Sequence, residues 1–133
     1  MENGVTYVLA LALGGGVGSM LRASLSALVS RFAHPAWGTL SVNLSGSLLI
    51  GVALAWAGAA LAYPPPRTVW FDYFAIGVLG GYTTVSSFAL QTLQLWQDGR
   101  ARAACANAAV SVIACPALAA LGYGLAVLAL GGA

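Results

Sequence analysis

The chain has 133 residues, of which 60% are hydrophobic and only 6% are charged. A soluble domain carries about 25% charged residues, so this composition predicts a membrane protein that forms a single unit over residues 1–133. The formal net charge of +2 comes from arginines spread along the chain. Nucleic-acid binding is therefore not expected, because it needs a clustered basic face.

Four apolar segments are long enough to cross a lipid bilayer, which takes about 20 residues. They run from about residue 5 to 28, 37 to 62, 71 to 96 and 103 to 130. The expected fold class is an all-α membrane protein with four transmembrane helices, and an even number of crossings places both termini on one side. Arginines are enriched in the first and third connections, so the positive-inside rule favours the cytoplasm for that end.

The first segment carries glycines and one basic residue. Gly14 and Gly18 are four residues apart, a spacing that lets two helix backbones approach closely, so we expect a packing face there. Arg22 follows within the last two turns of the segment. Its side chain either reaches the membrane interface or lines a vestibule for an anion.

The second segment has a polar face. Thr39, Asn43, Gly46 and Ser47 recur at helical spacing and share one side of the helix. The amide of Asn43 offers two donors, which would suit an anion that is losing its hydration water. The alternative is an interhelical hydrogen bond that holds the bundle together.

The third segment contains glycines and hydroxyl residues at its centre, in the stretch Gly77–Phe88. Consecutive glycines beside two threonines predict a third helix broken at its centre, since glycine lowers helix propensity by about 1 kcal/mol. Such breaks are tolerated in membranes where the backbone is buried in protein or lines a polar cavity. In the fourth segment, Asn107, Ser111 and Cys115 form a weaker polar stripe that packing alone would explain.

Acidic residues are absent from the interiors of all four segments. Glu2, Asp72 and Asp98 are the only acids, and the single imidazole, His34, falls in a connection. Proton- or cation-coupled transport generally needs an intramembrane carboxylate or histidine, and a nucleophile–base pair would need a base. An enzyme is therefore not expected, and the remaining hydroxyls and amides favour passive handling of an anion.

Three motifs in this order resemble the Fluc/CrcB family of small fluoride channels. They are Gly15–Arg22 in the first segment, Gly38–Gly46 in the second, and Gly80–Thr84 followed by Ser86 and Phe88 in the third. The resemblance covers nearly the whole chain. It implies an antiparallel dual-topology homodimer in the bacterial plasma or inner membrane, which lets cytoplasmic fluoride leave passively and so reduces its toxicity.

The resemblance also implies site residues. A structural Na⁺ would lie at the dimer interface, held by the backbone carbonyls of Gly80 and Thr83. The residues that would line the fluoride pore are Arg22, Asn43, Val85, Ser86, Ser87, Phe88 and Ser111. The implied partners are fluoride, the lipid bilayer and a second copy of the chain.

The chain departs from the family pattern at three places in the third segment. Val85 stands where the family has the first of two phenylalanines, Ala89 replaces a serine, and Gln91 replaces a glutamate. An alternative is therefore a diverged subunit of a heteromeric pair that works with a paralogous subunit. A small multidrug-type exporter is another alternative, but it needs a glutamate in its first membrane helix, and here Glu2 precedes that helix. A membrane subunit with a purely structural role would not explain why Asn43 lies in an apolar segment.

Overall fold

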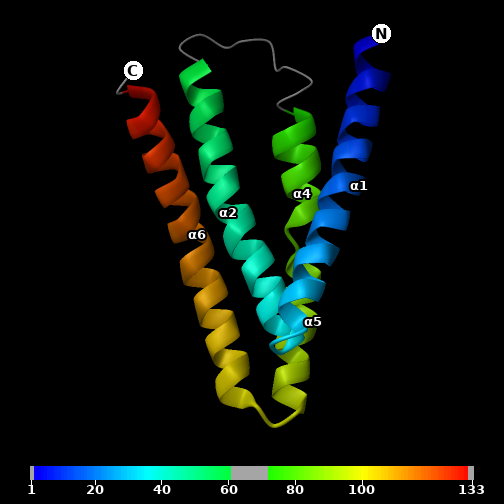
Figure 1. Ribbon diagram of the computed structural model, residues 1–133, viewed down its shortest axis with the longest axis vertical. Coiled ribbons are helices and arrows are strands. Elements are labelled where there is room, and N and C mark those ends of the chain that lie inside the picture. Colours follow the sequence, from blue (N-terminus) through cyan, green and yellow to red (C-terminus); the bar gives the residue numbers. More distant parts are fainter. Residues whose placement is uncertain (1, 61–71, 132–133) are drawn as a thin grey trace.

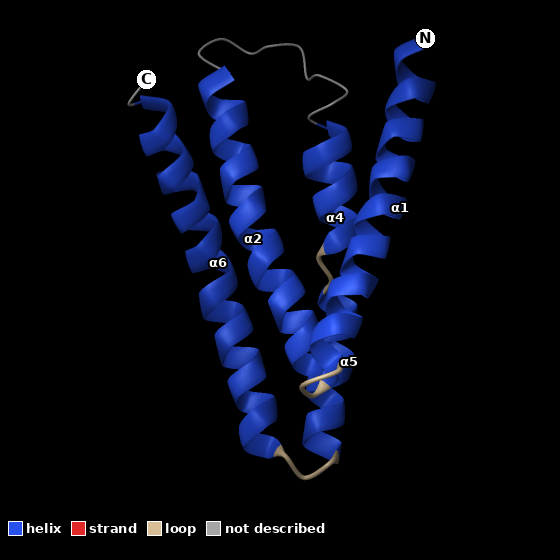
Figure 2. Ribbon diagram, viewed as in Figure 1, coloured by secondary structure: helices blue, strands red, loops and turns tan. Residues whose placement is uncertain are grey.

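The described part of the chain is helical, with three long helices and one interrupted segment. The helices are α1 (Glu2–Ser30), α2 (Pro35–Ala60) and α6 (Ala101–Gly131). The interrupted segment contains η1 (Asp72–Val78), which is π-helical, then α4 (Leu79–Tyr82) and α5 (Val85–Gln97). The computed structural model describes residues 2–60 and 72–131, and Figure 2 shows no strand in these ranges. The all-helical prediction is confirmed.

The three long helices are suited to a bilayer. Their apolar spans cover Gly4–Ser30, Pro35–Ala57 and Ala101–Gly131, which contain 27, 23 and 31 residues. At about 1.5 Å per residue, each is long enough for a hydrocarbon core of about 30 Å. The interrupted segment runs beside them, and no single helix within it reaches that length. The chain is a multi-pass membrane protein.

Both termini lie at one end of the molecule (Figure 1), as an even number of crossings requires. The α1–α2 and α5–α6 connections lie at the other end. The helices extend two to three residues beyond several predicted ends. Residues 61, 62 and 71, where the predicted second and third segments end and begin, lie outside the described residues.

The two short connections at the end opposite the termini have identifiable local causes. His34 precedes α2, and its Nδ1 accepts a hydrogen bond from the backbone N–H of Ala36 at 3.2 Å, which satisfies one free donor at the helix start. Gly99 lies between α5 and α6 with a φ of 74°. Glycine adopts this left-handed conformation without the steric cost that a Cβ would add, so the chain can turn there.

Glycines bring α1 close to the interrupted segment. A Cβ on Gly14 would lie 2.6 Å from the carbonyl oxygen of Tyr73, and one on Gly18 would meet the carbonyl oxygen of Val78. Any larger residue would push the two backbones apart. The packing face predicted at Gly14 and Gly18 is confirmed.

A second glycine seam joins α2 to α6. A Cβ on Gly51 would meet the carbonyl oxygen of Ala119, and one on Gly122 would meet that of Leu48. The contact is reciprocal, since each helix supplies one glycine and one backbone oxygen. Small residues of this kind allow close van der Waals packing where lipid provides no hydrophobic drive between helices. The two seams hold α1 and α6 at the two outer sides of the molecule, with α2 and the interrupted segment between them (Figure 1).

Candidate functional site

Two extended residues separate α4 from α5. Thr83 has φ −77° and ψ 156°, and Thr84 has φ −153° and ψ 127°. Both values of ψ lie in the β region, which a helix cannot accommodate. The glycines just before them, Gly80 and Gly81, weaken the helix that leads in. The N–H of Thr83 still donates to the carbonyl oxygen of Leu79 at 3.0 Å, but the backbone groups of Thr84 must find partners outside a helix.

Asn43 of α2 supplies those partners to Thr84. Its Nδ2 donates to the carbonyl oxygen of Thr84 at 2.8 Å, and its Oδ1 accepts from the N–H of Thr84 at 2.8 Å. In a continuous helix that N–H would donate to the carbonyl of Gly80, four residues earlier. Because Asn43 takes the donor, the Gly80 carbonyl loses its usual partner.

Thr84 in turn caps the start of α5. Its Oγ1 accepts from the backbone N–H of Ser87 at 3.3 Å, and it also hydrogen-bonds the hydroxyls of Ser86 at 3.2 Å and Ser87 at 3.3 Å. This is the usual role of a threonine before a first helical turn. In a continuous helix the Ser87 N–H would donate to the carbonyl of Thr83. The two residues expected to hold a cation, Gly80 and Thr83, are thus among those whose carbonyls lose their helical donors at the break.

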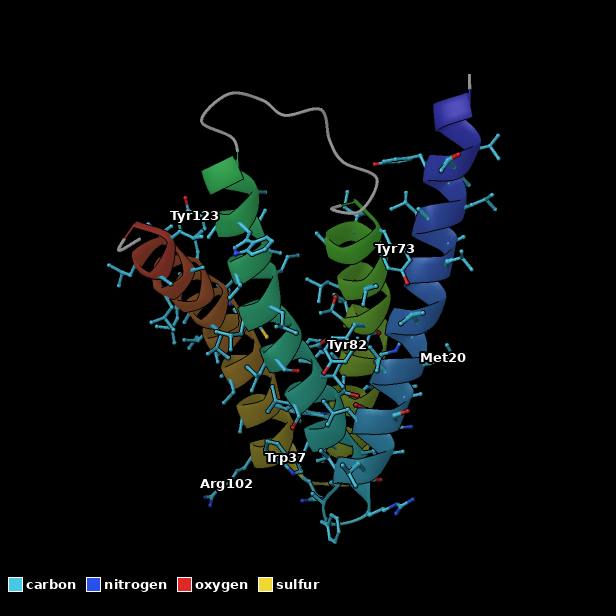
Figure 3. The ribbon with its side chains drawn as sticks, turned by 45° about the horizontal axis from the view of Figure 1, so that its top comes forward. Met20, Trp37, Tyr73, Tyr82, Arg102 and Tyr123 are labelled. Atoms are coloured by element: carbon cyan, nitrogen blue, oxygen red, sulfur yellow. The ribbon has the colours of Figure 1, made fainter. Side chains whose placement is uncertain are left out.

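The residue before the extended pair is fixed to α2 as well. Tyr82 is buried between α4 and α2 (Figure 3), and its hydroxyl lies 2.8 Å from Oγ of Ser45. Gly46 makes room for this contact, since a Cβ there would lie 3.1 Å from the Tyr82 ring and would overlap Cγ2 of Thr83. The Ser45–Tyr82 pair was not predicted from the sequence. Its only sequence signal is a serine two residues beyond Asn43.

The remaining predicted pore residues do not all meet in one chain. Ser86 is exposed, Ser87 and Phe88 are half-buried, and Val85 is 78% exposed at the first position of α5. Arg22 is half-buried on α1. Ser86 and Ser87 join Asn43 through Thr84, as described above. Phe88 lies on the side of α5 that borders α6.

The contact between α5 and α6 contains a second polar group. Asn107 of α6 is only 1% exposed, and its Nδ2 donates to Oγ1 of Thr92 at 2.7 Å. Thr92 donates to the carbonyl of Phe88 at 2.7 Å. The predicted pore residue Ser111 lies one turn from Asn107 on α6, and its buried hydroxyl has no partner among the described residues. From the sequence, Asn107 was expected only to pack, and Thr92, which falls four residues after Phe88, was not predicted to take part.

A shallow groove of about 370 Å³ runs along this α5–α6 contact. Phe88, Thr92 and Trp96 border it from α5, and Ala104 and Ala108 border it from α6. Its walls are otherwise apolar, so Thr92 is the polar group nearest to Phe88 on this surface. The groove therefore connects the predicted pore aromatic with the Asn107–Thr92 pair.

The chain is similar to known proteins over most of its length. Residues 9–123 match the family model described as CrcB-like protein, Camphor Resistance (CrcB). Fluoride-specific ion channel FluC 2 of Rhodopseudomonas palustris (strain BisB18) is 46% identical over 132 residues, which cover 95% of this chain and 97% of the relative. FluC of Rhodospirillum rubrum is 45% identical over 117 residues, covering 84% and 86%. FluC 3 of Brucella suis biovar 1 is 42% identical over 114 residues, covering 84% and 85%. The chain belongs to the CrcB-like family.

Proposed function

We propose that the protein is a fluoride-selective channel that passively exports cytoplasmic fluoride and so reduces its toxicity. The observation that carries the proposal is the match over 95% of the chain to a relative named fluoride-specific ion channel. Hydrogen fluoride that enters the cell from an acidic medium ionises near neutral pH, and the trapped anion leaves through the channel. A passive route fits a sequence without acids between residues 3 and 71 or between 73 and 97.

Asn43 is the centre of the proposed anion path. One of its N–H groups and its oxygen hold Thr84, while its second N–H has no acceptor among the described residues. A donor fixed in this way needs no reorganisation when the ion arrives, which is favourable in a low-dielectric site. The edge of the Phe88 ring, which carries the positive rim of the aromatic quadrupole, offers a second stabilising surface.

The polar path continues on both sides of these two residues. Ser86, Ser87 and Ser111 would supply hydroxyl donors, Val85 would line the wall beside Phe88, and Arg22 would attract the anion at the vestibule. Hydroxyl and amide donors stabilise fluoride more weakly than a buried full charge would. A conducting path requires such weak binding, because the ion must be able to leave each position. This set contains no negatively charged side chain.

The active form in this proposal is an antiparallel dual-topology homodimer, with the break in the third membrane segment at its two-fold axis. The carbonyls of Gly80 and Thr83 fit a bound Na⁺, because hard oxygen ligands without helical donors suit an alkali cation. Gly80 is exposed, and nothing lies within 4 Å of the position of a Cβ there, so a second copy could approach. Two copies of these carbonyls would repel each other without a cation between them.

The test is fluoride efflux from liposomes that contain the purified protein. Vesicles loaded with potassium fluoride should release fluoride when potassium is made permeant, and a fluoride electrode records the release. Vesicles loaded with potassium chloride should retain their anion. Release of both anions at equal rates would contradict the proposed selectivity.

A heteromeric pair is the second candidate. Val85 is 78% exposed, and it stands where the family pattern has the first of two phenylalanines. Ala89 and Gln91 also depart from that pattern. Numbered relatives named FluC 2, FluC 3 and FluC 4 match this chain. If the chain works only with a paralogous subunit, it will give no efflux when purified alone. Full efflux from the chain alone would exclude this candidate.

A further inference from the structure

Basic side chains are concentrated at the end of the molecule opposite the termini. Arg31 lies in the α1–α2 connection, and Arg100 and Arg102 lie just before and just inside the start of α6. All three are exposed, and Figure 1 shows the two connections at the same end. Asp98 is the only acid of this region, and within the described residues it forms no ion pair with the arginines. This end therefore carries an excess of positive charge.

Close packing holds this end of the molecule together. Ala36 of α2, Leu95 of α5 and Ala104 of α6 are at most 2% exposed and pack against one another. Gly38 brings α2 close to α1, since a Cβ there would lie 2.7 Å from the carbonyl oxygen of Ser26. The helix ends next to the three arginines are therefore held at fixed relative positions, which keeps the positive charges together.

Helix stability does not explain all of these charges. Arg31 directly follows α1, where the helix dipole favours a cation. Arg102 lies in the first turn of α6, where the same dipole disfavours a cation, and Figure 3 shows its side chain extending away from the helices. Arg100 makes hydrogen bonds only through its backbone among the described residues. A negatively charged group beside these side chains would offset the unfavourable position of Arg102.

Two aromatic side chains accompany the arginines. Phe32 directly follows Arg31 and is 86% exposed, and Trp96 lies in the last turn of α5 and is 59% exposed. Water disfavours such exposure of an apolar ring, whereas the boundary between lipid headgroups and acyl chains favours it. Guanidinium groups and apolar rings at neighbouring positions match the phosphate of a phospholipid and the carbon atoms that follow it.

We propose that this end, which we call the basic end and define by Arg31, Phe32, Trp96, Arg100 and Arg102, binds an anionic phospholipid. The guanidinium groups donate paired hydrogen bonds to the phosphate oxygens, and the two rings pack against the glycerol and the upper part of the acyl chains. A zwitterionic lipid carries a cation beside its phosphate, which the arginines repel, so the basic end prefers a headgroup such as phosphatidylglycerol. A free phosphate ion would use the arginines and gain nothing from the rings. The inference does not depend on the proposed channel function.

The experiment measures lipid binding to the purified protein in a non-ionic detergent. Native mass spectrometry counts bound lipids during titration with dioleoyl phosphatidylglycerol or dioleoyl phosphatidylcholine, and circular dichroism records the melting temperature. Phosphatidylglycerol should bind about tenfold more tightly than phosphatidylcholine and should raise the melting temperature, because a ligand of the folded state stabilises it. An increase in sodium chloride from about 0.1 to about 0.5 M should weaken this binding, since salt screens exposed charges.

Charge variants locate the binding. Arg31→Gln, Arg100→Gln and Arg102→Gln should each weaken phosphatidylglycerol binding about fivefold, and the triple variant about a hundredfold. The matched control is Arg67→Gln, which removes the same charge from the connection between the second and third predicted membrane segments and should leave binding unchanged. Phe32→Ala should weaken the binding of phosphatidylglycerol but not the stabilisation by inorganic phosphate, which distinguishes a lipid from a free ion.

Three results would overturn the inference. They are equal binding of the two lipids, an equal loss of binding in Arg67→Gln and in the variants of the basic end, and stabilisation by inorganic phosphate as strong as that by phosphatidylglycerol. Size-exclusion chromatography establishes that each variant is folded. If the triple variant does not fold, the three single variants decide the outcome, because each removes only one exposed side chain.

Discussion

Asn43 and Asn107 both connect a continuous helix to the interrupted segment, but the two contacts differ in how completely they are satisfied. Asn43 of α2 makes two bonds of 2.8 Å to the backbone of Thr84 and uses both its oxygen and its NH₂ group. Asn107 of α6 makes one bond of 2.7 Å to a side chain and leaves its oxygen buried and unpaired. In the first contact both backbone groups of Thr84 are paired, and one N–H of Asn43 has no acceptor among the described residues. The second leaves one buried acceptor without a partner among the described residues.

The two contacts therefore differ in what they replace: Asn43 stands in for helical backbone hydrogen bonds, and Asn107 does not. The bonds of Asn43 replace helical bonds, so without them two backbone groups would be left unpaired. Asn107 replaces no backbone bond, and its unpaired oxygen costs about 1–3 kcal/mol. Stability measurements should therefore separate the two residues even where both reduce fluoride efflux.

Asn43→Leu should have the largest effect. It leaves the N–H and the carbonyl of Thr84 without partners, and at about 1–3 kcal/mol for each group we expect a loss of about 2–6 kcal/mol in the free energy of unfolding. The extended stretch would lose its fixed shape, and fluoride efflux should disappear. Thermal unfolding in detergent, followed by circular dichroism, measures the first effect, and the fluoride electrode measures the second.

Asn107→Leu makes the same substitution at the α6 contact and should have a much smaller effect on stability than Asn43→Leu. It removes one hydrogen bond and one unpaired oxygen together, so the free energy of unfolding should change by no more than about 1 kcal/mol. Ser41→Ala serves as the control on α2. If Asn43→Leu were as stable as the wild type, the bonds to Thr84 would not hold the extended stretch, and the distinction between the two asparagines would fail.

Gly18→Ala should have the next largest effect, because it presses from the side of α1 on the helical turns just before the extended stretch. The new Cβ would meet the carbonyl oxygen of Val78 and would lie 2.8 Å from the backbone nitrogen of Tyr82. Overpacking of this kind costs about 1–3 kcal/mol. The matched control is Gly16→Ala, since nothing lies within 4 Å of a Cβ there. Equal melting temperatures for the two variants would show that α1 can shift away from α4.

Much of this arrangement could be predicted from the sequence. Apolar length predicted the helices, and the spacing of Gly14 and Gly18 predicted a close seam, because both depend on local periodicity. The sequence also drew attention to Asn43, since an amide in an apolar segment needs a partner. It could not identify Thr84 as that partner, because the two residues are 41 positions apart and only the packing of α2 against the interrupted segment brings them together.

The residues that sequence reasoning overlooked have weak local signals. Ser45 and Thr92 are hydroxyl residues in apolar helices, where such side chains commonly bond to their own backbone, as both do here. Their long-range partners, Tyr82 and Asn107, are fixed by helix contacts and not by spacing along the chain. The π-helical start at Asp72–Val78 also has no clear sequence signal.

Tyr82→Phe also weakens the contact between α2 and the interrupted segment, and it should have a smaller effect on stability. It removes the hydroxyl that lies 2.8 Å from Oγ of Ser45 and leaves the ring packed against Gly46. We expect a loss of about 0.5–1.5 kcal/mol in the free energy of unfolding, because Ser45 still bonds to the backbone of Ser41. Chemical denaturation measures it, and Ser45→Ala with the double variant completes a mutant cycle. Additive losses in that cycle would mean that the two hydroxyls do not interact.

Val85→Phe should have the smallest effect on stability, and it tests where the conducting surface lies. Val85 is 78% exposed at the start of α5, so the larger side chain meets no neighbour within the chain, and the free energy of unfolding should change by no more than about 0.5 kcal/mol. In the proposed path the added ring would offer fluoride a second aromatic edge beside Phe88, which should raise the efflux rate. Val85→Leu is the control, because it adds bulk without a ring quadrupole and should leave the rate unchanged. A lower rate in folded Val85→Phe would show instead that valine fits this pore and that the aromatic edge of Phe88 is sufficient there.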